Sequence, residues 1–437
     1  MFYILALLLS FASLFADENA SISMYAINMG TGEVLIDQEG DRSLIPSSCM
    51  KIVTIAAALH LLDPQESFHT NLEYDGTIDR EGVLHGNLYI RGDGDPCLGS
   101  DRIASSPSWQ KQLEVWRDVV SQSGIKKILG KVIGDASKWE KALAVPSWSW
   151  EDLGNYYGAG ACALSFHENY YSLYFKPAEA VGEAAGIART DPALSNLTFQ
   201  NEVTTGPVGS GDRACIYGSE FSPIQYVRGT VPAGVSEFVI KGAIPDPSTY
   251  CASLLTKALR DRGISIEERE QPKQGRKVLH TTDSPPISEI IYWTNQKSIN
   301  LYAEHLLKKI GETVYHEGST QAGTRAIVDF LRSQNIDTKG FNMADGSGLS
   351  RKNLITAKQL VTVLQKMKKS PHFPIFLRSL PQNGDLIHAK SGAMSLIKTY
   401  AGYAGDIAFA ILINQCLDTA MMNDKIQLFL SDLKTKR

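Results

Sequence analysis

Residues 45–62, with the sequence IPSSCMKIVTIAAALHLL, form the stretch that decides the fold. From Ile52 onward the residues are almost all apolar, which predicts a buried helix that ends near residue 63. Lys51 lies at the start of this helix, where a lysine must either extend to water or have a local task. Ser48 precedes Lys51 by three residues. Residues three apart share a helix face about 5–6 Å apart, so the spacing predicts that the two side chains are neighbours.

A serine at the N-terminus of a helix lies beside free backbone N–H groups and the positive end of the helix dipole. Such N–H groups can hold a developing oxyanion, and a neutral lysine amine can take the serine proton. Ser48 and Lys51 are therefore candidates for a nucleophile and its base. The alternative is a capping serine beside a lysine that extends to solvent. Without the flanking hairpin, proline and apolar helix, the pattern Ser-x-x-Lys recurs at Ser108, Ser123, Ser395 and Ser431.

A second candidate element is TNQKSINLYAEHLL, in which Ser298 and Asn300 stand at the start of a helical pattern. Residues two apart do not share a helix face, but a short turn can direct both side chains into a cleft. The alternative is helix capping, for which Ser and Asn are both suited. Ser333 and Asn335 repeat the pattern elsewhere in the chain.

A third candidate element is HAKSGAM, a strand pattern near the C-terminus that contains Lys390, Ser391 and Gly392. Strand alternation would place Lys390 and Gly392 on one face. Gly392 would leave room for a substrate backbone, and Lys390 would offer a fixed cation for a carboxylate. The alternative is an edge-strand lysine that discourages aggregation.

The composition of the whole chain excludes several classes of protein. Its 437 residues predict two or three domains, and its net charge of −4 gives no reason to expect nucleic acid as a partner. None of the six cysteines is spaced as Cys-x-x-Cys, which disfavours a zinc or thioredoxin-like site. His167-Glu168 and His316-Glu317 both lack the second histidine of a zinc-peptidase motif. We therefore expect no metal and no cofactor.

The N-terminal sequence MFYILALLLSFASLFADENA is apolar from Phe2 to Ala16 and then acidic. An apolar run of this length fits the core of a signal peptide and is short for a membrane span. We expect a leader over residues 1–16, export of the rest of the chain, and no integral membrane domain after the leader is removed. Because no Lys or Arg precedes the run, an uncleaved N-terminal anchor is the alternative.

The pattern along the chain predicts one α/β domain interrupted by β-structure. A hairpin is predicted over residues 21–37, and residues 165–245 are rich in Gly, Thr and Val without a helical period. The strand patterns LIHAKSGAM and IAFAILINQ lie near the C-terminus, followed by a predicted helix from Thr419 to Lys434. Further helical patterns cover residues 108–122, 250–263, 286–310, 319–333 and 356–368.

The order Ser-x-x-Lys, Ser-x-Asn and Lys-Ser-Gly resembles the signature of the serine penicillin-binding proteins and β-lactamases. The chain is most similar to the D-alanyl-D-alanine carboxypeptidase/endopeptidase family typified by penicillin-binding protein 4, peptidase family S13. The resemblance covers nearly the whole exported chain. It also rests on LYIRGDGDPCLGS (88–100), NYYGAGACALSFHENYYSLYF (155–175), VPAGVSEFVIKGAIPDPSTYCASLLTKALRDRGI (231–264) and MADGSGLSRKNLIT (343–356).

The resemblance implies a mixed α/β (α+β) fold, in which a β-lactamase-like transpeptidase domain is split by inserted β-rich domains. It also implies an exported, periplasmic enzyme, a location that is compatible with peripheral association with the membrane surface. The boundaries that follow are a leader at 1–16, a catalytic domain at 17–67 and 277–437, an inserted domain II at 68–164 and 241–276, and a nested β-rich domain III at 165–240.

The resemblance also implies the reaction. Ser48 would attack the penultimate D-alanine carbonyl of a peptidoglycan stem peptide that ends in D-Ala-D-Ala. Lys51 would be the base, Ser298 would relay a proton to the leaving amine, and Asn300 would hold Lys51 and the substrate amide.

Substrate binding would fall to the third element. Lys390 and the Ser391 hydroxyl would bind the terminal carboxylate, and the oxyanion would lie between the N–H groups of Ser48 and Ala393, which follows Gly392. β-Lactams would acylate Ser48 because they mimic the D-Ala-D-Ala terminus.

The sequence departs from the family pattern at three positions. Ser391 stands where Thr is commoner, but it keeps the hydroxyl, and Ile299 stands where Asp is often found. Cys49 beside the nucleophile is unusual, and we expect a small buried side chain there. Two alternatives remain at this level: a β-lactamase or esterase on the same fold, and a non-catalytic cell-wall-binding sensor that keeps the cleft.

Overall fold

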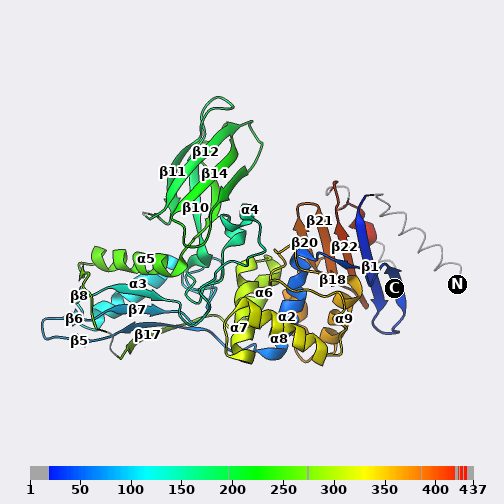
Figure 1. Cartoon of the computed structure of the whole chain (residues 1–437), viewed down its shortest axis with the longest axis horizontal. Coiled ribbons are helices and arrows are strands. Elements are labelled where there is room, and N and C mark those ends of the chain that lie inside the picture. The colour runs from blue at the N-terminus through cyan, green and yellow to red at the C-terminus, as the bar shows by residue number, and fades with distance from the viewer. Residues whose placement is uncertain are drawn as a thin grey trace. The chain divides into compact units, whose positions relative to one another are not determined.

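The computed structural model describes residues 19–194, 196–272, 275–384 and 386–418, together with Met422, Asp424–Ile426 and Leu428–Leu430. The chain divides into two compact units (Figure 1). Unit 1 consists of residues 1–65 and 287–437, and unit 2 consists of residues 66–286. The predicted leader at 1–16 lies outside the described residues, and so does most of the helix predicted from Thr419 to Lys434.

Unit 1 is built on one antiparallel sheet with the order β19-β20-β21-β22-β1-β2. Figure 1 shows the first strand, in blue, beside the last strand, in red. The predicted hairpin and both predicted C-terminal strands are confirmed. The strands are β1 (Ser21–Asn28), β2 (Val34–Gln38), β19 (Gln382–Asn383), β20 (Ile387–Met394), β21 (Ile397–Ala404) and β22 (Ile407–Asn414), with the short pair β3 (Ser43–Leu44) and β18 (Ile355–Thr356) beside them.

Both faces of this sheet are covered. Ile22 and Met24 of β1 share an apolar cluster with Ile411 and with Met422 and Phe429 near the C-terminus. Helix α9 (Ala357–Lys368) contacts β1, β21 and β22. Every residue of β22 is buried. A strand buried on both faces is apolar throughout, which is why IAFAILIN has no polar alternation.

The remaining helices of unit 1 surround α2. Ten residues of α2 are buried, which agrees with its apolar character on all sides. Helix α2 contacts α6, α7, α8 and α9. The helices are α2 (Met50–Leu61), α6 (Ile287–Gln296), α7 (Asn300–Tyr315), α8 (Thr320–Ser333), α9 (Ala357–Lys368) and α10 (Phe373–Ser379), and a 3₁₀ turn, η1 (Ser47–Cys49), precedes α2.

The helical pattern predicted over residues 286–310 is two helices in the structure. Helix α6 ends at Gln296 and α7 begins at Asn300. Ser298 lies between them with a φ of 55°, in the left-handed region that ends a helix. The polar run TNQKS at residues 294–298 coincides with the break, so the prediction of one continuous helix over 286–310 is wrong there.

Unit 2 surrounds its own apolar core. Trp116 of α3, Phe175 of β10 and Leu255 of α5 belong to one buried cluster. The β-structure predicted over residues 165–245 is present in β10 to β15, and the helices predicted at 108–122 and 250–263 are α3 (Trp109–Gln122) and α5 (Pro247–Asp261). Among the described residues of unit 2, the sheets have the orders β17-β4-β7-β9, β16-β8-β6-β5, β11-β10-β15 and β12-β14-β13.

The strands of unit 2 are β4 (His69–Tyr74), β5 (Thr77–Ile78), β6 (Val83–His85), β7 (Leu88–Arg91), β8 (Lys127–Leu129), β9 (Val132–Asp135), β10 (Tyr170–Lys176), β11 (Gly186–Asp191), β12 (Thr198–Gly206), β13 (Arg213–Tyr217), β14 (Ile224–Pro232), β15 (Phe238–Ala243), β16 (Ser265–Glu267) and β17 (Lys277–Asp283). Short helical turns are α4 (Trp150–Leu153), η2 (Tyr156–Gly158) and η3 (His167–Asn169). Because β17 pairs with β4, residues 277–283 belong to unit 2, whereas the sequence-based boundary of the catalytic domain is residue 277.

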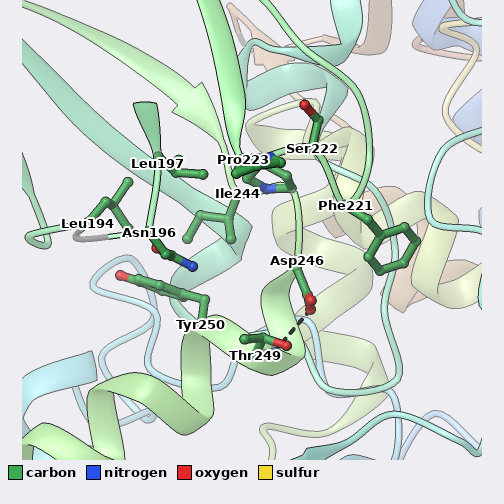
Figure 2. A pocket seen from close by; sticks show the side chains of 11 residues that line it. Leu194, Asn196, Leu197, Phe221, Ser222, Pro223, Ile244, Asp246, Thr249 and Tyr250 are labelled. Carbon is green, nitrogen blue, oxygen red and sulfur yellow. Dashed lines mark hydrogen bonds between the residues drawn. The ribbon is translucent and has the colours of Figure 1, made fainter. Parts of the chain in front are cut away.

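A cavity of about 240 Å³ lies in unit 2 at the start of α5 (Figure 2). Leu197, Pro223 and Ile244 form part of its apolar wall. Asp246 caps α5 by accepting a hydrogen bond from the backbone N–H of Thr249 at 3.0 Å. The residues proposed from sequence for the reaction all lie in unit 1.

Candidate active site

Ser48 is placed by η1, the 3₁₀ turn that leads into α2. Ser47 has a φ of 47°, a left-handed conformation that is unfavourable for a non-glycine residue. The Thr399 hydroxyl on β21 donates to the Pro46 carbonyl at 2.7 Å and lies 3.2 Å from the Cys49 sulfur. Cys49 is a free, fully buried thiol. These contacts hold η1 against β21, while Ser48 remains partly exposed.

Lys51 is the second residue of α2 and is fully buried. Its Nζ is 3.2 Å from Ser48 Oγ. It also donates to Asn300 Oδ1 at 2.7 Å and to the Ser347 carbonyl at 2.6 Å. Three oxygens therefore fix the position of the amine, and one of them is the hydroxyl of the candidate nucleophile.

The surroundings of Lys51 favour a neutral amine. Burial is the largest cause and the Lys390 cation is the second, and together they lower the pKa of Lys51 to about 7. Asp345 and Glu304 act in the opposite direction and raise it. A lysine with a pKa near neutrality is half deprotonated at pH 7 and can accept a proton there.

Asn300 and Ser298 occupy the start of α7 and the turn before it. Asn300 is the first residue of α7 and contacts Lys51 directly. Ser298 lies two residues earlier, in the left-handed turn described above, and is partly buried. The structure therefore brings Asn300 to Lys51, and the relay role of Ser298 stays a prediction.

Strand β20 carries the third element. Lys390 and Gly392 are buried, and Ser391 and Ala393 are exposed, as strand alternation requires. Lys390 Nζ donates to the Ser391 carbonyl at 2.6 Å. Burial lowers the pKa of Lys390 to about 8, so this amine is still mostly protonated at pH 7.

Gly392 allows β20 to lie against η1. A Cβ at this position would come within 2.3 Å of Thr399 Oγ1 and within 2.9 Å of both the Pro46 carbonyl oxygen and the Ser48 nitrogen. A side chain would therefore displace the strand from the nucleophile. The glycine is therefore needed for β20 to pack against η1. The sequence predicts a second reason for it, which is room for a substrate backbone.

The loop that contains Asp345 and Ser347 completes the environment of Lys51 and was not predicted from the sequence. Ser347 contributes a backbone carbonyl, for which no residue type is a signal. Glu304 and Asp345 are buried carboxylates near the lysine. Asp345 and Ser347 belong to the stretch MADGSGLSRKNLIT, which carries part of the family resemblance. The resemblance implied no role in the site for either residue.

Within the residues that the structure describes, no group of three or more His, Cys, Asp and Glu side chains could hold a metal ion. The described helices likewise include none that is long and apolar enough to cross a membrane.

The chain is similar to known carboxypeptidases over most of its length. The D-alanyl-D-alanine carboxypeptidase of Actinomadura sp. (strain R39) is 28% identical over 433 residues, which cover 91% of this chain and 78% of the relative. The D-alanyl-D-alanine carboxypeptidase DacB of Haemophilus influenzae is 25% identical over 402 residues, which cover 89% of this chain and 81% of the relative.

The fold matches a solved structure throughout. Penicillin binding protein 4 (dacB) from Haemophilus influenzae superposes with a TM-score of 0.81 at 22% identity, covering 98% of this chain and 99% of that chain. The predicted fold class is therefore confirmed. The model of one peptidase family matches residues 8–432, and the chain accordingly belongs to the D-Ala-D-Ala carboxypeptidase 3 (S13) family.

Proposed function

We propose that this D-Ala-D-Ala carboxypeptidase works through an acyl-enzyme on Ser48 and also cuts peptidoglycan cross-links. The observation that carries the proposal is the 3.2 Å contact between Ser48 Oγ and Lys51 Nζ, an amine whose pKa is lowered to about 7. A serine beside a neutral lysine is an activated nucleophile.

The reaction has two halves. Ser48 Oγ attacks the carbonyl of the penultimate D-alanine, and its proton passes to Lys51 Nζ. The N–H groups of Ser48 and Ala393 stabilise the oxyanion. The tetrahedral intermediate collapses, the C–N bond breaks, and the leaving amine receives the proton held by Lys51 by way of Ser298. Water then attacks the ester and gives a proton to Lys51. Lys51 passes this proton to Ser48 Oγ as the ester C–O bond breaks, and the new carboxylic acid loses its own proton to solvent.

Recognition of the peptide terminus falls to β20 and α7. The Lys390 ammonium and the Ser391 hydroxyl bind the terminal carboxylate, and the Asn300 side chain, which already accepts from Lys51, binds the substrate amide. When the leaving amine belongs to a neighbouring stem peptide, the same steps break a cross-link. A β-lactam acylates Ser48 in the same way, but its ring-opened leaving group stays attached and slows hydrolysis.

A fluorescent penicillin tests the nucleophile. We expect a covalent band on a denaturing gel for the wild type, and no band for Ser48→Ala, because that variant has no hydroxyl to acylate. Ser123→Ala is the matched control, since Ser123 also precedes a lysine by three residues but lies in unit 2. An equal band in Ser48→Ala would contradict the assignment.

Two alternatives give different results in the same experiment. A β-lactamase or esterase would turn over the drug rapidly instead of retaining it, so hydrolysis of the free drug would accompany a weak band. A non-catalytic sensor would show neither a band nor hydrolysis. Digestion of cross-linked muropeptides by the wild type, and not by Ser48→Ala, would support the endopeptidase activity.

We also propose that the chain is exported, with cleavage of the leader after residue 16. The apolar run from Phe2 to Ala16 supports this proposal. N-terminal sequencing of the protein recovered from the periplasm would test it, with residue 17 as the expected first residue.

A further inference from the structure

Glu304 is a buried carboxylate that none of the proposed steps uses. It lies on α7 one helical turn after Asn300, and only 2% of the residue is exposed. Both of its oxygens accept backbone hydrogen bonds from one loop. Oε2 accepts from the N–H of Gly346 at 3.1 Å, and Oε1 accepts from the N–H of Ser347 at 2.7 Å. A carboxylate that holds two successive N–H groups fixes the path of that loop.

Ser347 connects this loop to the lysine beside the nucleophile. Its carbonyl accepts from Lys51 Nζ at 2.6 Å, which is the shortest of the three contacts of that amine. The Thr54 hydroxyl, on the helix that carries Lys51, donates to the Gly346 carbonyl at 2.7 Å. Glu304 and Lys51 are therefore connected by two hydrogen bonds to the backbone of one residue, Ser347.

The number of oxygens around Lys51 sets the direction of its lone pair. A neutral amine has two N–H groups and one lone pair. Asn300 Oδ1 and the Ser347 carbonyl are acceptors only, so each needs one of the two N–H groups. The lone pair is then left for Ser48 Oγ, which is the hydroxyl among these three oxygens and has a proton to give. Without the Ser347 carbonyl, the amine could rotate and direct an N–H at Ser48 instead.

Charged groups face Lys51 from several elements. Lys390 on β20 lowers the pKa of Lys51, whereas Asp345 in the loop and Glu304 on α7 raise it. The Cys49 thiol on η1 also faces Lys51, and burial raises the pKa of that thiol, so it is uncharged near pH 7. Burial, followed by the nearby Asp345, raises the pKa of Glu304 itself to about 7. Because the Glu304 carboxylate raises the pKa of Lys51, removal of its charge should move the titration of Lys51 to lower pH.

We propose that Glu304 is a positioning residue of the reaction, which holds the Ser347 carbonyl on Lys51 so that the lysine lone pair points at Ser48. This inference rests on the proposed function, because it takes Lys51 as the base for Ser48.

Two substitutions separate the shape of Glu304 from its charge. Glu304→Gln keeps the length of the side chain but has no charge. Its NH₂ group would face one of the two backbone N–H groups, and two donors cannot form a hydrogen bond with each other. Glu304→Asp keeps the charge but is too short to reach both N–H groups. Glu312→Gln is the matched control, since Glu312 lies on the same helix, is partly exposed and is two turns farther from Asn300.

The first measurement is the rate of acylation by a fluorescent penicillin across the pH range. We expect both substitutions to lower the maximal rate about tenfold or more, because small displacements of a reacting group cost rates of that order. In Glu304→Gln the rise in rate with pH should also move to lower pH, whereas in Glu304→Asp it should stay near that of the wild type. Glu312→Gln should behave as the wild type.

The second measurement is independent of acylation. The protein is labelled with ¹³C-lysine, the Lys51 signal is assigned by its loss in Lys51→Met, and its titration is followed by NMR. The midpoint should fall in Glu304→Gln, a change that a merely structural role would not produce. If Glu304→Gln does not fold, the rate and midpoint of Glu304→Asp decide.

An unchanged maximal rate and an unchanged Lys51 midpoint in Glu304→Gln would overturn the inference, even if Ser48→Ala confirmed the nucleophile. Conversely, if the wild type formed no acyl-enzyme, the proposed function would fail. A lowered midpoint in Glu304→Gln would then still support the action of the Glu304 charge on Lys51.

Discussion

Under the proposed mechanism, two buried lysines should give the reaction its dependence on pH. The pKa of Lys51 is lowered to about 7 and that of Lys390 to about 8, mainly by burial in both cases. Lys51 must lose its proton to act as a base, so the acylation rate should rise as the pH increases through 7. Lys390 must keep its proton to bind a carboxylate, so the rate should fall as the pH increases through 8. A bell-shaped profile of kcat/KM with a narrow maximum is expected.

A change of substrate separates the two limbs of this profile. An ester that lacks the terminal carboxylate does not need the Lys390 charge. It should therefore lose the fall at high pH and keep the rise through 7. A flat profile between pH 6 and 9, or the loss of the other limb, would contradict the roles given to the two lysines.

At the residue scale, the sequence predicted groups whose chemistry lies in a side chain. The i, i+3 spacing predicted the proximity of Ser48 and Lys51, and the structure has 3.2 Å between their polar atoms. The Ser347 carbonyl could not be predicted in this way, because every residue has a carbonyl. Glu304 lies in an apolar helical pattern, where a carboxylate normally indicates an exposed position.

At the scale of elements, the packing of β20 on η1 can be tested at Gly392. We expect Gly392→Ala to fold but to be acylated about tenfold to a hundredfold more slowly, because its Cβ would push the strand away from Ser48. Acylation rates and thermal melting of the variant check this. Gly186→Ala is the control, since a Cβ there would meet nothing within 4 Å. A wild-type rate in Gly392→Ala would show that the contact is not required.

The elements that the sequence predicted well are those with a strong period or a continuous apolar run, such as β22 and α2. Strand β21 was missed although it lies in the middle of the sheet. It contains Gly402, a residue that weakens strand patterns. A Cβ there would meet the backbone oxygen of His388 on β20 at 2.2 Å. The close approach of two strands, which only the fold reveals, explains the glycine.

At the scale of the whole molecule, unit 2 is an insertion whose two ends meet. The backbone N–H of Ser288 donates to the carbonyl of Pro64 at 2.9 Å, so unit 1 is closed at the point where the chain leaves and returns. Replacement of residues 66–286 by a short Gly-Ser linker should leave unit 1 folded and able to acylate Ser48 with penicillin. Circular dichroism and the gel assay measure this outcome.

The same variant carries its own control. Ser48→Ala in the shortened chain should give no band, which distinguishes true acylation from labelling of a misfolded protein. A shortened chain that is soluble and folded but not acylated would mean that unit 2 supplies part of the reaction. Cleavage of cross-linked peptidoglycan by the shortened chain would then be absent as well.

The pairing of β1 with β22 has a consequence for synthesis. Ser21 is aligned with Asn414, and β1 lies between β2 and β22. During translation, therefore, the sheet beside Ser48 stays open until β22 has been made. This topology delays assembly of the candidate site, so products truncated before β22 should not be acylated by penicillin.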